Sequence, residues 1–209
     1  MKKLAYLFLV LPIWLYSQPN CNSFLYKGDT LQYKACKLVE DISHHQSTRI
    51  FQEQYDEAIK ICPKFAYAYR EKSTAYLKSG DFITWKKWID KAVEYDWEGN
   101  LGYRGWCRYQ FFRDYKGAIK DIETLDSLAN YNIGYSINGD YHLNIAKGIC
   151  YSAINQKQKA IKIFNDQLKE KDYSVGLYDY YQLGVTYYEV NDFDTALKCF
   201  EKQNEVNEF

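Results

Sequence analysis

The stretch from Tyr178 to Gln203, YDYYQLGVTYYEVNDFDTALKCFEKQ, contains the pattern on which the fold prediction rests. At about 100° per residue, one stripe of its first helix holds Tyr180, Leu183, Gly184 and Tyr187. The polar pair Asn191-Asp192 ends that helix and caps the next, since both side chains accept hydrogen bonds from exposed backbone N–H groups. Ala196 and Phe200 then supply the facing apolar stripe. The stretch therefore predicts a helical hairpin in which a glycine allows close approach of the two helices.

The same pattern recurs earlier in the chain. The segments GICYSAINQKQKAIKIFNDQ from Gly148 and RGWCRYQFFRDYKGAIKDIETL from Arg104 also run from a small residue through an aromatic residue and a polar break to an alanine. Weaker copies cover residues 72–96 and 37–65. A single hairpin cannot bury its apolar face alone, so these copies predict a stack of hairpins.

The spacing of the copies suggests a known repeat family. Equivalent second-helix positions are separated by 34, 33, 42 and 36 residues and hold Phe51, Trp85, Ala118, Ala160 and Ala196. A period close to 34 with helix–turn–helix content resembles the tetratricopeptide repeat (TPR). The resemblance covers residues 32–209 and implies an all-α fold, a right-handed α-solenoid of about five TPR-like hairpins. The expected repeats are residues 32–65, 66–98, 99–130, 141–174 and 177–209.

The N-terminal residues predict export. Lys2 and Lys3 precede an apolar run that extends from Leu4 to Tyr16 and is followed by the small residue Ser17. That run is too short to span a bilayer comfortably, so residues 1–17 are interpreted as a removable secretory signal. Residues 18–31 are expected to form an extended segment. The mature protein is predicted to be exported to a bacterial envelope, periplasmic or secreted, with no stable membrane span.

Export makes disulfides chemically possible. The six cysteines are widely separated, and no CxxC pair supports a zinc or redox motif. Cys21 is the best candidate for a bridge, because an N-terminal segment gains most from attachment to the helices that carry Cys36 and Cys62. The other cysteines are interpreted as small apolar core residues.

Composition and motifs argue against several classes of function. Basic and acidic residues balance at 27 each, so no field of one sign predicts a nucleic acid or anionic membrane partner. His44 and His45 are adjacent and would point apart on a helix, which does not suit a metal. Carboxylates such as Asp90 and Asp121 are expected on solvated helix faces. The sequence predicts no enzyme, no cofactor and no metal.

The resemblance also implies where a partner would bind. In this family the first helices of the hairpins line a concave surface, and a second stripe of each first helix would face into it. The stripe places Tyr67, Arg70 and Thr74; Tyr103, Trp106 and Tyr109; His142, Ile149 and Ser152; and Tyr178, Tyr181, Val185 and Tyr188 at matching positions. An aromatic groove for a protein or peptide partner follows. A second interpretation stays open, in which these rings pack between repeats.

The predicted function is a non-enzymatic protein-interaction scaffold. Members of the family that grip a C-terminal carboxylate use Lys, Asn and Arg, whereas the matching positions here hold Thr74, Trp106, Ile149 and Val185. Two alternatives remain: a structural or assembly subunit that self-associates through its C-terminal repeat, and a carbohydrate-binding module. The 42-residue step between Ala118 and Ala160 is longer than the others and predicts a loop near residues 126–142. This loop is either solvated or placed beside the binding face.

Overall fold

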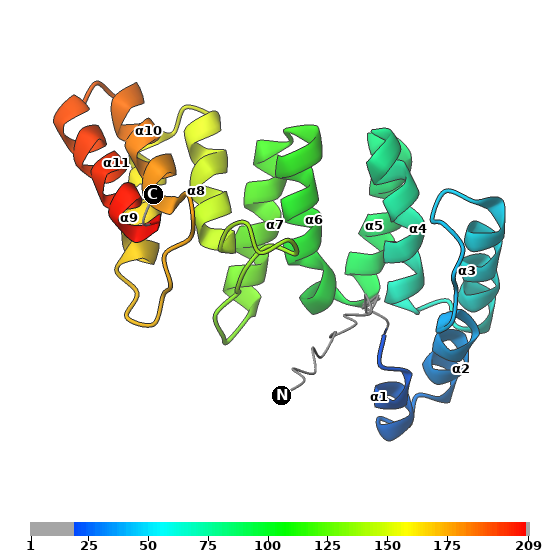
Figure 1. The fold of residues 1–209 in the computed structure, drawn as a ribbon. Coiled ribbons are helices and arrows are strands. Elements are labelled where there is room, and N and C mark those ends of the chain that lie inside the picture. Colours follow the sequence, from blue (N-terminus) through cyan, green and yellow to red (C-terminus); the bar gives the residue numbers. More distant parts are fainter. Residues whose placement is uncertain (1–18, 208–209) are drawn as a thin grey trace, which may run out of the picture.

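A computed structural model describes residues 19–207 and contains helices in that part of the chain, with no β-strand there. The helices are α1 (Cys21–Tyr26), α2 (Thr30–Val39), α3 (Arg49–Ile61), α4 (Ala66–Ser79), α5 (Phe82–Tyr95), α6 (Trp97–Phe112), α7 (Tyr115–Leu128), α8 (Leu143–Ala153), α9 (Lys157–Leu168), α10 (Asp179–Glu189) and α11 (Phe193–Asn207). From α2 onward they pair into five hairpins that follow one another in a row (Figure 1). The predicted all-α solenoid of helical hairpins is confirmed.

The helix contacts define the curvature of the row. Helix α6 contacts the first helices on both sides, α4 and α8, and α8 also contacts α10. Within residues 19–207, the backbones of second helices in neighbouring hairpins do not approach one another, and α3, α5, α7 and α9 each pack on the first helix of the next hairpin. Because only first helices approach their equivalents this closely, they lie on the inner side of the curve. We call the surface formed by α4, α6, α8 and α10 the inner face.

Each tight hairpin turn repeats one backbone device. The residue after the first helix, or shortly after it, has a left-handed conformation: Gly80, Arg113, Asn155 and Asn191, with φ of 76°, 53°, 62° and 64°. An aspartate follows in three of these turns and accepts a backbone N–H of the second helix, as Asp192 does from Thr195 at 3.2 Å. Asparagine tolerates the left-handed region better than most residues, so the predicted break at Asn191-Asp192 has a local cause.

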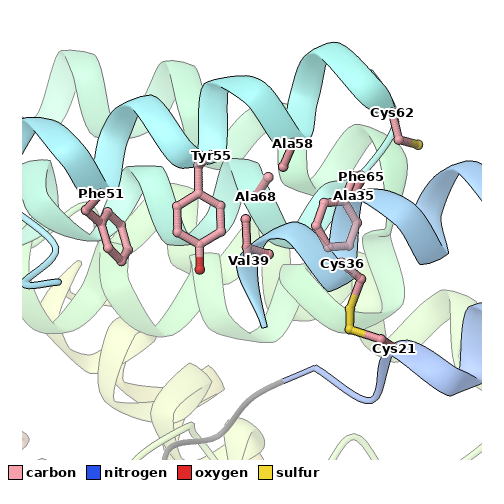
Figure 2. Packing of buried hydrophobic residues seen from close by; sticks show 10 residues of the cluster. All are labelled: Cys21, Ala35, Cys36, Val39, Phe51, Tyr55, Ala58, Cys62, Phe65 and Ala68. Carbon is pink, nitrogen blue, oxygen red and sulfur yellow. A yellow bond between two sulfur atoms is a disulfide. The ribbon is translucent and has the colours of Figure 1, made fainter. Parts of the chain in front are cut away.

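The first hairpin is tied to the N-terminal segment by a disulfide between Cys21 and Cys36 (Figure 2). The predicted bridge from Cys21 is therefore confirmed, with Cys36 as its partner. The segment predicted as extended, residues 18–31, is not extended where the structure describes it, from residue 19 on: α1 occupies Cys21–Tyr26, and α2 begins at Thr30 because Asp29 accepts the Gln32 backbone N–H at 2.9 Å. The predicted signal, residues 1–17, lies outside the described residues.

The remaining cysteines are core residues, as expected. Cys62, Cys107, Cys150 and Cys199 are buried free thiols in the clusters that join one hairpin to the next. Burial raises the pKa of Cys107 and of Cys150 to about 12, so both thiols stay protonated at neutral pH. Their role in the described part of the chain is packing.

The prediction of a solvated Asp121 is wrong. This side chain is 1% exposed and accepts two hydrogen bonds from Arg104, from Nε at 2.9 Å and from a terminal nitrogen at 2.6 Å. Arg104 also donates to Asp90 at 2.8 Å, and Arg108 lies 3.2 Å from Asp121. The two arginines come from α6 and the two carboxylates from α7 and α5, so the ion-pair network joins neighbouring hairpins.

Candidate functional site

The segment between α7 and α8, residues 129–142, packs against the solenoid. We call it the insertion. Ile133 and Ser136 in it are buried. Its Tyr131 hydroxyl donates to Glu98 of α6 at 2.9 Å, and its Tyr135 hydroxyl donates to the Ser174 carbonyl at 3.1 Å. The insertion therefore connects the inner face at α6 with the segment that precedes α10, which favours the second of the two interpretations of this loop.

A first pocket lies between α4, α6 and the insertion. Its volume is about 180 Å³, and Arg70 of α4 and Tyr103 of α6 line it together with Ile133, Tyr135 and Ile137. The Arg70 guanidinium lies over the Tyr103 ring, 4.5 Å from its centroid, a distance typical of a cation–π contact. Burial raises the pKa of Tyr103 well above its ordinary value. We call this cavity the arginine pocket.

A second, larger pocket lies further along α6. Its volume is about 570 Å³, and its walls are Tyr109 and Gln110 of α6, residues 138–141 of the insertion, and residues 175–178 before α10. The Gln182 amide of α10 donates to the Tyr141 hydroxyl at 3.1 Å and so fixes this ring. Burial raises the pKa of Tyr141, and the carboxyl groups of Asp179 and Asp140 raise it further. We call this cavity the tyrosine pocket.

A third surface lies at the C-terminal end of the row and is not part of either pocket. Tyr181 of α10 packs against Phe200 of α11 with ring centroids 5.7 Å apart, and Tyr188 packs against Phe193 at 5.2 Å. These contacts leave much of the surface uncovered: Tyr181 is 48% exposed and Tyr188 is 59% exposed. We call the surface of Tyr181, Val185, Tyr188, Phe193, Leu197 and Phe200 the end face.

The predicted groove residues are distributed over these places. Arg70 and Tyr103 line the arginine pocket, and Tyr109 and Tyr178 line the tyrosine pocket. Thr74 is half-buried, and its hydroxyl donates to the Arg70 carbonyl at 3.4 Å. Tyr181 and Tyr188, in contrast, belong to the end face.

Other predicted groove residues are parts of the core. Tyr67 is half-buried against the first cluster, and burial raises its pKa to about 12. Ile149 is half-buried in the cluster that joins α8 with α10. Ser152 lies between these two helices, with its hydroxyl 3.2 Å from that of Thr186. These three residues support the interpretation in which second-stripe side chains pack between repeats.

Two of the predicted groove residues are buried, so their assignment to an exposed groove is wrong. Trp106 is 4% exposed, because α6 is covered by four neighbouring helices; its ring packs against Phe111 at 5.2 Å. His142 is 2% exposed and caps α8, where Nδ1 accepts the Asn144 backbone N–H at 3.1 Å. Its Nε2 lies 2.7 Å from the Asn132 side-chain oxygen.

Sequence reasoning missed the pocket residues that the insertion contributes. Asp140 and Tyr141 line the tyrosine pocket together with Tyr109, although neither occupies a position that was predicted to face the groove. The signal that could have found them is the repeat spacing itself, because an extra segment before a first helix emerges beside the inner face. Within the insertion, the turn at Asn138-Gly139, with φ of 72° at Gly139, reverses the direction of the chain before Tyr141.

Residues 19–207 contain no group of three His, Cys, Asp or Glu side chains placed to hold a metal ion. None of the helices from α1 to α11 combines the length and apolar character that crossing a bilayer requires.

Comparison with known proteins agrees with the fold. Residues 180–209 match the model of the tetratricopeptide repeat family. Sequence comparison with curated proteins gives no match. Among solved structures, YrrB, described as a TPR protein with an unusual peptide-binding site, is similar with a TM-score of 0.57 and 16% identity over 89% of this chain and 82% of YrrB. MamA is similar with a TM-score of 0.60 and 17% identity over 92% of this chain and 97% of MamA.

These likenesses identify the class of the protein. At such low identity the two structures show a shared fold, and the family match covers the last hairpin, α10–α11. The chain is a tetratricopeptide-repeat protein in fold, and its last hairpin carries the sequence pattern of the repeat.

Proposed function

We propose that the chain is a non-enzymatic scaffold that holds an extended segment of a partner protein on its inner face. The observation that carries the proposal is the pair of pockets along α6, one at Arg70 and Tyr103 and the other at Tyr109 and Tyr178. Tyr103 and Gln110, which line one pocket each, are seven residues apart on α6, about two turns or roughly 10 Å. The two pockets therefore suit side chains that lie a few residues apart in an extended peptide. Rigid tyrosine rings give contact area at little cost in conformational entropy.

Two further observations support this proposal. YrrB, which shares the fold, is described as having a peptide-binding site. Two buried carboxyl groups whose pKa is raised by burial have structural partners: Asp121 accepts from Arg104, and Asp179 accepts the Gly176 backbone N–H at 2.7 Å. These contacts give the two carboxyl groups a structural role in joining helices and ordering the segment before α10.

Peptide selection with the full chain tests the scaffold. Peptides enriched from a random display library are expected to lose at least about tenfold in affinity for Tyr178→Ala and for Arg70→Gln, since each change removes a pocket wall. Tyr26→Ala is the matched control, because this ring on α1 is 89% exposed and distant in sequence from both pockets. Equal affinity of the selected peptides for all three variants would show that they bind elsewhere.

A second candidate function is assembly of two copies of this chain through the end face. Repeat equivalence supports it: Gly102 of α6 and Tyr181 of α10 occupy matching positions, and a Cβ on Gly102 would lie 3.0 Å from Leu143 of the next first helix. Ser152 of α8 likewise contacts α10 and matches Tyr188. The end face thus has the geometry of an inter-hairpin interface, and it is exposed in the described residues.

Sedimentation velocity across the micromolar range tests this assembly. The chain is expected to dimerise in a concentration-dependent way, and Tyr188→Glu together with Leu197→Glu should give a monomer by placing charges in the apolar contact. Ile83→Glu is the control, because this exposed residue on α5 is outside the end face. A chain that sediments as a monomer at every concentration would reject the second candidate.

We also propose that the protein is exported and works in an oxidising compartment. The bridge between Cys21 and Cys36 supports this, because disulfides persist in such compartments and are rare in the cytosol. N-terminal sequencing of the protein from its native host is expected to give Gln18 as the first residue.

Burial of Trp106 weakens the carbohydrate-binding alternative, since a buried ring cannot stack on a sugar.

A further inference from the structure

We propose that the tyrosine pocket binds a basic side chain, arginine or lysine, of the segment that docks on the inner face. This inference rests on the proposed scaffold function and names the chemistry of one of its pockets. Tyrosine rings from three separate elements, Tyr109, Tyr141 and Tyr178, line the cavity, and the exposed carboxylate of Asp140 stands beside them. Aromatic faces and a carboxylate are the groups that attract an ammonium or guanidinium ion.

The charge balance of the pocket favours a cation. Its walls include Asp140 but no lysine, arginine or histidine among residues 138–141, residues 175–178, Tyr109 and Gln110. Behind residues 175–178 lies a second carboxyl group, that of Asp179, which accepts the Gly176 backbone N–H and the Tyr173 hydroxyl. A positive side chain that enters the cavity would therefore meet the carboxylate of Asp140 and no like charge from the walls.

The arginine pocket differs in this respect and provides an internal comparison. There the chain supplies its own cation: Arg70 lies over Tyr103, and Glu98 lines the same cavity. The same pairing of a cation with a tyrosine ring occurs at Lys202 over Tyr180, with 4.7 Å from Nζ to the ring centroid. In the tyrosine pocket the rings and the carboxylate are present, and the partner would supply the cation.

The volume of the cavity suits this occupant. At about 570 Å³ it lies within the range of sites that bind small ligands, so it can accept a whole arginine or lysine side chain. Gln110 on the wall adds an amide oxygen that can accept an N–H from a guanidinium group. Arginine, with five donors, can use both Asp140 and Gln110, and we therefore expect it to bind better than lysine.

A synthetic peptide array tests the inference with the full chain. The probes are acetylated and amidated nonapeptides with randomised neutral flanks and a fixed central Arg, Lys, Gln, Leu or Glu. The Arg and Lys pools are expected to bind about five to ten times more chain than the Gln and Leu pools, with the Glu pool weakest. The difference should shrink as salt is raised, because Asp140 is exposed to solvent.

Two variants and their matched controls locate the effect. Asp140→Asn preserves the shape of the side chain and removes its charge, and Tyr178→Ala removes one exposed ring; each should abolish most of the preference for Arg and Lys. Asp194→Asn and Tyr26→Ala make the same changes at exposed positions on α11 and α1 and should leave the preference unchanged.

The outcomes separate this inference from the scaffold proposal. If peptides bind in a Tyr178-dependent manner but the five pools bind equally, or if Asp140→Asn retains the full preference, the basic side chain is the wrong occupant and the scaffold stands. If no pool binds the chain at all, both proposals fail.

Discussion

Phe200 of α11 packs directly over Gly184 of α10, where a side chain on the glycine would collide with it. A Cβ at Gly184 would lie 2.5 Å from Cε1 of the Phe200 ring. The preceding hairpin repeats the contact, since a Cβ at Gly148 would lie 2.6 Å from Cε1 of Phe164. The small residue that recurs in the sequence is therefore the place where a second-helix ring presses on the first helix.

Gly184→Ala is expected to destabilise the last hairpin. Ala is the better helix former by about 1 kcal/mol, but overpacking against the Phe200 ring costs about 1–3 kcal/mol, and the collision should decide the sign. Thermal unfolding should show a lower Tm for Gly184→Ala. In a chain that already carries Phe200→Leu, Gly184→Ala should cost much less stability, because the smaller side chain leaves room for the new methyl group. The effects of the two substitutions on stability should therefore not add. A higher Tm for Gly184→Ala alone would mean that Phe200 moves aside freely.

The network of Arg104 and Asp121 gives a second prediction. Asp121→Asn removes one charge from a buried pair with two-pronged geometry and leaves the guanidinium partly unpaired, which costs about 3–5 kcal/mol in buried pairs. Urea unfolding should show this loss. Asp166→Asn is the control: its carboxylate is 59% exposed and pairs with Lys162, which is 75% exposed, so its loss should cost at most about 1 kcal/mol. An equal loss in the free energy of unfolding for the two variants would show that burial does not strengthen the pair of Arg104 and Asp121.

Reduction of the Cys21–Cys36 bridge gives a third prediction. The bridge closes a loop of sequence separation 15, for which the chain-entropy model gives about 3 kcal/mol. The helix contacts of α1 are with α2, so the loss should be local. Hydrogen exchange is expected to accelerate in α1 and α2 after reduction and to stay unchanged in α10 and α11. In a Cys21→Ala, Cys36→Ala chain the reductant should have no effect on these rates.

The sequence was sufficient to predict the hairpins because their causes are local. The stripe of Leu183 and Gly184, the Asn191-Asp192 break and the repeated alanines each act within one or two turns of helix. The Cys21 bridge was also accessible, since few helices lie near the N-terminal segment in sequence. These features need no knowledge of how distant segments pack.

The candidate site was harder to predict because it depends on non-local contacts. A stripe on an isolated helix does not reveal that α6 packs against four other helices, and Trp106 is buried for that reason. Nor does the composition of the insertion show that it packs against α6 and brings Asp140 to Tyr109. The predicted groove also grouped Tyr178 with Tyr181 and Tyr188. In the structure Tyr178 lines the tyrosine pocket, whereas Tyr181 and Tyr188 lie on the end face.

The buried His142 gives a fourth prediction, which concerns pH. Burial lowers the pKa of His142 to about 4, whereas the unfolded chain should titrate at the ordinary value near 6.5. Asn132, Tyr135 and Tyr173 surround the ring, and the more distant Asp126 and Lys147 act on it with opposite signs. Between pH 6.5 and 4 the unfolded state binds the extra proton, so the stability contributed by the neutral histidine is complete above pH 6.5 and is lost as pH falls toward 4.

His142→Asn should remove this pH dependence while keeping the cap of α8, because an asparagine oxygen can also accept the Asn144 backbone N–H. Urea unfolding at several pH values is expected to show that the wild type loses roughly 2–3 kcal/mol more than the variant between pH 6.5 and 4. Buried carboxyl groups such as Asp179, whose pKa is raised by burial, act in the opposite direction but are common to both chains and cancel in the difference. Parallel stability curves for the two chains would show that the folded protein accommodates a protonated His142, and that the insertion opens to solvent at this ring.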